Sequence, residues 1–166
     1  MSWQETLNTQ VCEKVTSTGK MHNCIEEAAL LNKSNLSPEA ATPGFHLKVY
    51  ELEVPNESET GTVVRPYDEK AALQTAIASK GHTKPRGGLR INGEEYQLEK
   101  FEPSTHMMIL TKLDGGACIA PTETFILFCS WSQSLETGGV KKTHQSPQLC
   151  YQQCFNFAQY LRSIGY

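Results

Sequence analysis

The sequence predicts an α+β fold, with a central antiparallel β-sheet and a helix at each end of the chain. Two observations carry this prediction. Amphipathic helical patterns open and close the chain, over residues 2–14 and 146–166. Between them, at residues 89–129, short strand-like runs alternate with tight-turn residues, as in a β-meander. Helices set apart from an antiparallel sheet are typical of α+β layer folds.

The first helix is predicted over residues 2–14. Ser2 suits its N-cap, because Glu5 follows three positions later, as in a capping box. Apolar residues then recur at every fourth position, which places them on one face of the helix: Trp3, Leu7 and Val11.

The segments that follow are less regular. The apolar stretch 24–31 suits either a strand or a helix. Residues 32–44 are rich in Asn, Ser and Pro, which predicts a loop. Residues 45–54 alternate as in a strand, with a one-residue slip that indicates either a bulge or an end of pairing. The polar, acidic residues 55–66 predict another loop.

A short helix and a hairpin come next. The helix is predicted from Asp68 to Ser79, with an inner face of Ala72, Leu73, Ala76 and Ile77. Asn92-Gly93 is a strong signal for a two-residue hairpin turn, which places Leu89 opposite Tyr96.

The meander continues from that hairpin. Strands are predicted at residues 107–113, 117–120 and 124–129, separated by turn residues such as Gly115-Gly116. The polar residues 130–145 predict a long loop.

The closing helix carries two kinds of face. Ser146 and Pro147 suit its N-cap and first position, and Gly165 suits its end. Its buried stripe is predicted to contain Cys150, Cys154, Phe157, Leu161 and Ile164. Several aromatic residues lie off this stripe: Tyr151, Phe155, Tyr160 and Tyr166. The helix is therefore a candidate binding platform.

Bulk properties exclude several classes of protein. The 166 residues suit one domain, and a net charge of -3 does not favour nucleic-acid binding. No signal peptide is visible, and no apolar run reaches the roughly 20 residues of a membrane span. We therefore expect a soluble, cytoplasmic protein whose six cysteines stay reduced and mainly fill the core. No His/Cys spacing fits a zinc site, so no metal or cofactor is predicted.

Four segments, in order, resemble the profilin family of actin-monomer-binding proteins. They are the opening Ser2-Trp3-Gln4, GGLRINGEEYQL (87–98), GGACIAPT (115–122), and a closing helix that ends in Gly165-Tyr166. The resemblance implies that both terminal helices pack together on one face of the sheet and the short helix on the other. It implies one domain over 1–166, with insertions at about 32–66 and 130–145.

Profilins bind proline-rich peptides between their terminal helices, where aromatic rings stack on a preformed polyproline II ligand. The resemblance assigns this role to Trp3, Tyr160, Leu161 and Tyr166. Thr6 stands where a further aromatic residue is expected, and no tryptophan occurs near residues 30–40. We therefore expect weaker or altered binding of proline-rich peptides.

The resemblance also assigns an actin-binding surface. Its residues are Lys112, Thr122, Lys141, Lys142, Tyr151, Gln152 and Asn156. Ala120 and Pro121 stand where the family usually has lysines, which removes positive charge that actin and phosphoinositide headgroups would meet. Lys141 and Lys142 are either a replacement for that charge or ordinary solvated loop residues.

These assignments predict a monomeric cytoskeletal protein, without catalytic residues, that regulates actin polymerisation. Its expected partners are monomeric actin, proline-rich proteins such as formin-type elongation factors and, more weakly, phosphoinositides. The alternative is a proline-rich-peptide adaptor with weak or no actin binding. A third class, a Cys–His enzyme or small-ligand sensor, has little support, because His22 near Cys24 and His144 near Cys150 form no specific signature.

Overall fold

The computed structural model describes most of the chain. The described residues are 2–12, 14–16, 19–21, 25–58, 60–85, 87–133, 135–137, 140–143 and 147–166. They fall into two compact units, which are described separately: Met1–Phe45 with Leu98–Tyr166, and His46–Gln97. None of the helices in this described part is long and apolar enough to cross a membrane.

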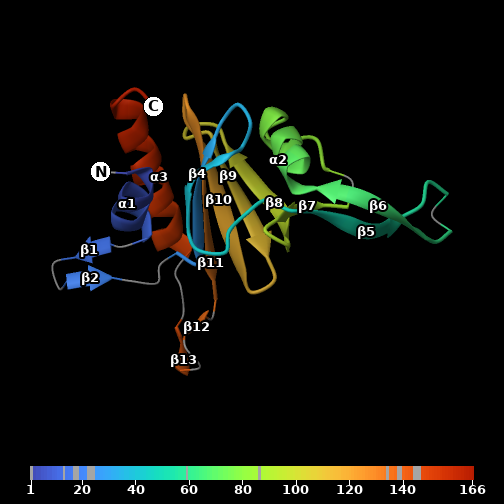
Figure 1. The fold of residues 1–166 in the computed structure, drawn as a ribbon, viewed down its shortest axis with the longest axis horizontal. Coiled ribbons are helices and arrows are strands. Elements are labelled where there is room, and N and C mark those ends of the chain that lie inside the picture. The colour runs from blue at the N-terminus through green and yellow to red at the C-terminus, as the bar shows by residue number, and fades with distance from the viewer. Residues whose placement is uncertain are drawn as a thin grey trace. The chain divides into compact units, whose positions relative to one another are not determined.

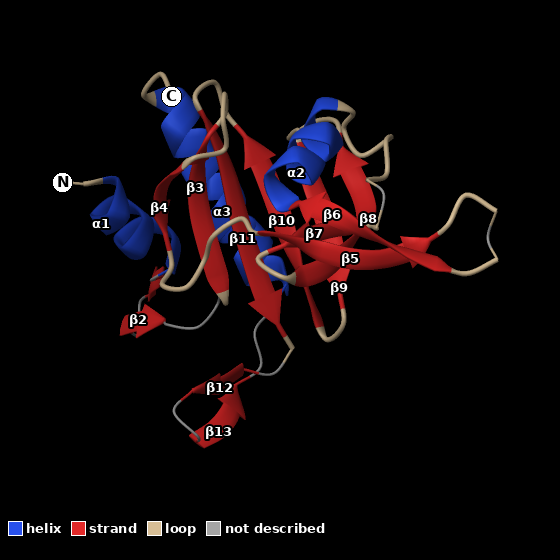
Figure 2. Ribbon diagram, turned by 45° about the vertical axis from the view of Figure 1, so that its right-hand side comes forward, coloured by secondary structure: helices blue, strands red, loops and turns tan. Residues whose placement is uncertain are grey.

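The first unit is an antiparallel sheet accompanied by both terminal helices (Figures 1 and 2). Its strands follow the order β4-β3-β11-β10-β9, with β8 next to β9. Their bounds are β3 Glu27–Asn32, β4 Pro38–Ala41, β8 Glu94–Glu102, β9 Met107–Lys112, β10 Gly115–Pro121 and β11 Phe125–Ser132. Two short ribbons are separate from this sheet: β1 Lys14–Thr16 with β2 Gly19–Met21, and β12 Leu135–Thr137 with β13 Val140–Thr143.

The terminal helices pack on the sheet. α1 spans Trp3–Leu7 and contacts β4 and β3, while α3 spans Pro147–Ser163 and contacts β10 and β11. Between α1 and β1 the chain forms a turn of π-helix, η1, at Asn8–Cys12. A π-helix changes the i→i−4 bonding of the chain, and here the Gln153 side chain donates to the Val11 carbonyl at 3.4 Å. This bond joins η1 to α3.

The core of the first unit lies where the helices meet the sheet. It is built from fully buried residues of every layer, including Leu7, Val11, Leu30, Leu127, Cys118, Cys129, Cys150, Cys154 and Leu161. Burying an aliphatic side chain of this size contributes about 1.5–3 kcal/mol. Ile164, predicted on the same stripe, is instead 47% exposed because α3 ends at Ser163.

The second unit combines a β-ribbon, a helix and the start of a hairpin. β5 (Val49–Pro55) pairs with β6 (Thr62–Asp68), α2 spans Glu69–Ala78, and β7 (Leu89–Ile91) pairs with the beginning of β8. Asp68 caps α2 by accepting bonds from the Lys70 and Ala71 backbone amides.

The predicted α+β fold is confirmed, with an antiparallel sheet and helices at both ends of the chain. The predicted pairing of Leu89 with Tyr96 is also confirmed. The segment 24–31, left open between strand and helix, contains most of β3. The predicted first helix exists, but it is interrupted by η1 after five residues.

Three loop predictions were wrong, because polar strands do not carry the alternation that marks a half-buried strand. Residues 32–44 contain β4, residues 55–66 contain most of β6, and residues 130–145 contain β12 and β13. Of the two alternatives for the slip within residues 45–54, a bulge is absent, since β5 pairs with β6 in one continuous register that begins at Val49. The predicted N-cap Ser146 lies outside the described residues.

Candidate functional site

Three aromatic rings meet where the two ends of the chain come together. The Trp3 ring centroid lies 5.0 Å from that of Phe125 and 5.1 Å from that of Tyr166, both at edge-to-face angles. Phe125 and Tyr166 stack at 5.8 Å with an interplanar angle of 23°. Such aromatic pairs contribute about 0.5–1.5 kcal/mol beyond their buried area. We call Trp3, Phe125 and Tyr166, together with Tyr160, the aromatic cluster.

The position of Trp3 is set by the start of α1. Ser2 accepts a bond from the Glu5 amide at 3.1 Å, and the Glu5 carboxylate accepts one from the Ser2 amide at 3.0 Å. This confirms the predicted capping box. The Gln4 side chain then bonds both the carbonyl and the amide of Ala41 on the edge strand β4. The helix is therefore fixed at its first turn, where Trp3 lies.

Tyr166 is held by backbone bonds on both sides. Its amide donates to the Leu161 carbonyl at 2.8 Å, and its carbonyl accepts from the Thr124 amide at 2.7 Å. Gly165 makes this return possible, since its φ of +90° is a conformation that strongly favours glycine. The last residue of the chain is thus placed beside the beginning of β11.

Phe125 is the buried member of the cluster. It is 3% exposed and opens β11, where its amide donates to Thr122 Oγ1 at 3.0 Å. Thr122, predicted to contact actin, is itself only 4% exposed. In this structure Thr122 orders the turn before β11.

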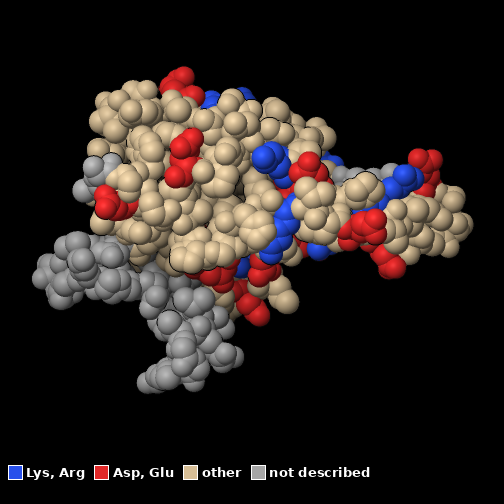
Figure 3. All heavy atoms as spheres, viewed as in Figure 1, with Lys and Arg blue, Asp and Glu red and all other residues tan. Residues whose placement is uncertain are grey.

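The surface of the aromatic cluster is open to a ligand. Tyr160 and Tyr166 are 48% and 40% exposed, and Trp3 is partly exposed. Tyr160 stacks on the buried Phe157 at 6.1 Å, which supports it from below. Leu161 is fully buried, so it supports the cluster from within the core. In the view of Figure 3, the described atoms around α1 are mostly uncharged, with acidic side chains among them.

The residues predicted to meet actin lie in different settings. Tyr151, Gln152 and Asn156 are on α3, where the side-chain Nε2 of Gln152 donates to Oδ1 of Asn156 at 2.8 Å. Tyr151 is partly buried, and its hydroxyl accepts a bond from Trp131 Nε1 at 3.2 Å. Burial raises the pKa of Tyr151.

The lysines assigned to the actin surface are less available to a partner than expected. Lys112 forms an ion pair with Glu26, and its side chain is only 4% exposed. The same Glu26 carboxylate accepts a bond from Ser130 at 3.4 Å. Lys141 and Lys142 are on β13, but their side chains lie outside the described part of the structure.

Four free cysteines meet in the core beneath α3. Cys118 and Cys129 face each other on β10 and β11, and Cys150 and Cys154 approach them from the helix. All four are fully buried, and burial raises the pKa of Cys118 and Cys129. Buried thiols of raised pKa are poor nucleophiles. Among the described residues, no group of three or more His, Cys, Asp or Glu side chains could hold a metal ion.

The second unit contains a buried carboxylate that sequence reasoning missed. Glu69 is fully buried at the start of α2 and accepts bonds of 2.7–2.9 Å from the Tyr50 hydroxyl and from the Lys48, Asn92 and Gly93 amides. A carboxylate in the first turn of a helix is usually exposed, so no pattern in the sequence marked it.

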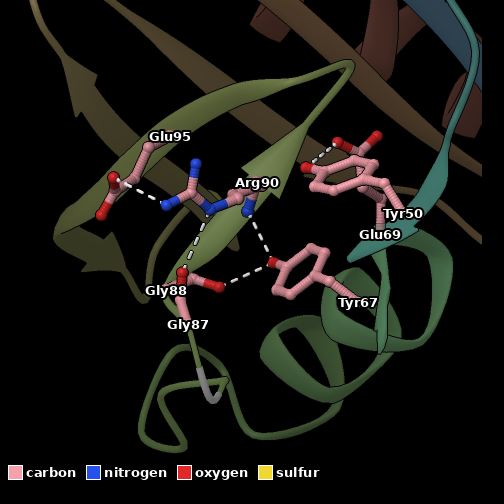
Figure 4. Close-up of polar contacts among 7 residues, drawn as sticks. All are labelled: Tyr50, Tyr67, Glu69, Gly87, Gly88, Arg90 and Glu95. Atoms are coloured by element: carbon pink, nitrogen blue, oxygen red, sulfur yellow. Dashed lines mark hydrogen bonds and ion pairs between the residues drawn. The ribbon is translucent and has the colours of Figure 1, made fainter. Parts of the chain in front are cut away.

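Beside this carboxylate, Tyr67 joins two segments of the second unit (Figure 4). Its hydroxyl donates to the Gly88 carbonyl at 2.6 Å and accepts from the Arg90 amide at 2.8 Å. Arg90 in turn forms an ion pair with Glu95 at 3.2 Å. The Tyr67 and Glu69 bonds fix the ribbon and the β7–β8 turn within this unit, which is a structural role.

Comparison with known proteins agrees with this arrangement of helices and sheet. The family model described as Profilin matches residues 1–166. The chain belongs to the profilin family. A comparison with curated protein sequences gave no match.

Solved profilin structures have the same fold at low sequence identity. Acanthamoeba castellanii profilin IA is 16% identical, with a TM-score of 0.65 over 99% of this chain and 100% of its own. Schizosaccharomyces pombe profilin is 20% identical, with a TM-score of 0.61 over 99% and 100%. Mouse profilin IIa, solved in complex with a double repeat from the FH1 domain of mDia1, is 15% identical, with a TM-score of 0.57 over both full chains.

The structure therefore brings together some of the predicted site residues. Trp3 and Tyr166 are in contact, and Tyr160 is exposed on the same end of α3. Sequence reasoning missed Phe125, the ring on which both of the first two pack. Its strand was predicted, but nothing in the sequence indicated that the first residue of β11 would lie beside the C-terminus.

Proposed function

We propose that this profilin binds proline-rich protein segments at the aromatic cluster and monomeric actin at another surface of α3, and so regulates actin assembly. The observation that carries the proposal is the Trp3–Phe125–Tyr166 cluster, in which Trp3 of α1 lies beside Tyr166, just after the end of α3, and the tyrosines remain exposed. The proposal is supported by the membership of this chain in the profilin family and by mouse profilin IIa, which was solved in complex with an FH1 repeat. The activity is binding, without catalysis.

The aromatic cluster suits an extended proline-rich ligand for two physical reasons. Proline rings are flat and apolar, and a polyproline II segment loses little conformational entropy when it binds. Tyr160 and Tyr166 also offer hydroxyl donors to the carbonyls of such a ligand, which has few amides of its own. Capping by Ser2 and the Gln4–Ala41 bonds hold Trp3 in place before the ligand arrives, which lowers the cost of binding.

The test is a titration with a ten-residue proline peptide, followed by tryptophan fluorescence. We expect saturable binding that quenches or shifts the emission of Trp3. A flat titration at millimolar peptide would contradict the proposal. Acceleration or delay of actin assembly, followed with a fluorescent actin, tests the actin half of the proposal separately.

A second candidate function is a proline-rich-peptide adaptor with weak or no actin binding. The observation that favours it is the Lys112–Glu26 ion pair, which neutralises a cation assigned to the actin surface. Binding of proline peptide without detectable binding of actin monomers would select this candidate. We propose a cytoplasmic, cytoskeletal location, a monomeric state and weak phosphoinositide binding on the same family grounds.

A further inference from the structure

Four thiols from two layers meet in the core of the first unit. Cys118 on β10 lies directly opposite Cys129 on β11 in the register of the sheet. Cys150 and Cys154 are four positions apart on α3, which places them on the same face of the helix. All four are free cysteines and fully buried in one cluster. Filling a core requires only that each residue be small and apolar, whereas disulfide chemistry requires thiols in contact.

Cys154 is the thiol that contacts both strand cysteines. Hydrogen bonding with Cys118 and with Cys129 lowers the pKa of the Cys154 thiol, against the opposing effect of burial. The pKa values of Cys118 and Cys129 are raised instead, mainly by burial. The thiolate is the nucleophilic form of cysteine. Cys154 is therefore the member of the cluster best suited to react first, and two thiols that can complete a disulfide lie in contact with it.

An open pocket borders this cluster of thiols. It has a volume of about 450 Å³ and lies between α3 and the strands β8 and β9. Its lining includes Ile109, the cross-strand partner of Cys118, and Phe155, the residue that follows Cys154. Hydrogen peroxide is little larger than water, so a brief local opening of α3 beside the pocket is enough to admit it to the thiols.

We propose that hydrogen peroxide converts Cys154 and one strand cysteine, Cys118 or Cys129, into a disulfide that links α3 covalently to the sheet. The Cys154 thiolate attacks one peroxide oxygen, the O–O bond breaks, and the hydroxide that leaves takes up a proton to become water. Cys154 is then a sulfenic acid. The strand thiol attacks its sulfur, an S–S bond forms, and the sulfenic hydroxyl leaves with the thiol proton as a second water. Two thiols are oxidised and one peroxide is reduced.

This disulfide restrains the helix that both proposed binding surfaces share. It joins α3 to β10 or β11, so the helix can no longer separate from that strand at Cys154. Tyr160 of the aromatic cluster and Asn156 of the surface assigned to actin follow Cys154 within two turns of α3. The modification itself needs neither partner, so its tests use the protein alone and stand or fall independently of the proposed function.

The first test exposes the folded protein to millimolar hydrogen peroxide overnight and maps its disulfides by mass spectrometry of non-reduced peptides. We expect a bond between Cys154 and either Cys118 or Cys129. The absence of any disulfide, or disulfides that all lack Cys154, would overturn the proposal.

Two matched variants, Cys154→Ala and Cys150→Ala, identify the reacting thiol of the helix. Each removes one fully buried thiol from the same face of α3, and thermal unfolding shows whether each variant folds. The rate of disulfide formation between helix and sheet should fall at least about tenfold in Cys154→Ala and change less than about twofold in Cys150→Ala. Equal rates in the two variants, or a larger loss in Cys150→Ala, would contradict the assignment. If Cys154→Ala does not fold, the disulfide map of the unmodified protein decides.

Hydrogen exchange measures the effect of the disulfide on α3. In the oxidised protein, the backbone amides of residues 154–161 should exchange at least about tenfold more slowly than in the reduced protein, because local opening of the helix is restrained. Reduction with dithiothreitol should restore the faster exchange. Unchanged exchange after complete oxidation would show that the bond does not restrain the helix and would overturn that part of the proposal.

Discussion

The aromatic cluster and the surface assigned to actin differ in how their key side chains are used. In the aromatic cluster, Trp3 and Tyr166 pack on Phe125 and still leave ring surface exposed. On the surface assigned to actin, Lys112 forms an ion pair with Glu26 within the protein and is almost fully buried. An aromatic ring can pack and bind at the same time, because it has two faces and an edge. A cation held in a buried ion pair has little charge left for a partner.

The largest effect is expected from Trp3→Ala at the aromatic cluster. Loss of this central ring should weaken proline-peptide binding by at least about 30-fold, the ~2 kcal/mol typical of an aromatic hot spot. Calorimetric titration measures it, with Leu113→Ala, at a 90% exposed turn position, as the control. Actin affinity should change by less than about twofold. Equal peptide binding by wild type and Trp3→Ala would remove the cluster from the site.

A smaller effect, on stability, is expected from Lys112→Met. It leaves the partly buried Glu26 without its cation, which should lower the free energy of unfolding by about 1–2 kcal/mol. Urea denaturation measures the change. The double variant Lys112→Met with Glu26→Gln should recover part of the loss. If Lys112→Met leaves stability unchanged but strongly weakens actin binding, Lys112 contacts the partner and our reading of the ion pair is wrong.

Alkaline pH should destabilise both units, through different side chains. Burial raises the pKa of Cys118 and Cys129 above 9.0 in the first unit, and of Tyr50 and Tyr67 above 10.0 in the second. The unfolded chain releases these protons at lower pH than the folded one. The free energy of unfolding should therefore be constant below pH 9 from these groups and should fall as pH rises further.

Thermal unfolding between pH 8 and 10.5 measures this decline. Replacement of Cys118 by Ala should reduce its early part, near pH 9, and leave the tyrosine part near pH 10. A melting temperature that rises over this range would show that other groups dominate the alkaline titration.

The smallest effect is expected from Tyr160→Phe. The ring that stacks on Phe157 stays, and only the exposed hydroxyl is lost, so proline-peptide affinity should fall by about twofold to fivefold. The same titration detects it. A loss as large as that of Trp3→Ala would mean that hydrogen bonding, and not ring packing, dominates recognition.

Local signals in the sequence were sufficient for the order of the main elements. The capping box at Ser2 and the Asn92-Gly93 hairpin were read correctly because each depends on residues within a few positions. The strands β4 and β6 were missed because their partners, β3 and β5, rather than their own composition, make them strands. The fold class could be predicted from the local signals alone, without knowledge of which strands pair.

The candidate site was predictable only in part, for the same reason. The closing tyrosines were marked by their place off the buried stripe of α3, and Trp3 by resemblance. Phe125 joins them only because Thr124 bonds the C-terminal carbonyl of Tyr166, a contact between residues 42 positions apart. The Lys112–Glu26 pair spans 86 positions, so nothing near Lys112 in the sequence indicates that its charge is already paired within the protein.

The most direct test of two independent surfaces on α3 is a titration of the proline peptide into protein saturated with monomeric actin. We predict that the peptide binds the complex with the same affinity as the free protein, within about twofold. Competition between peptide and actin for the protein would contradict the account, because it would place both partners on one surface.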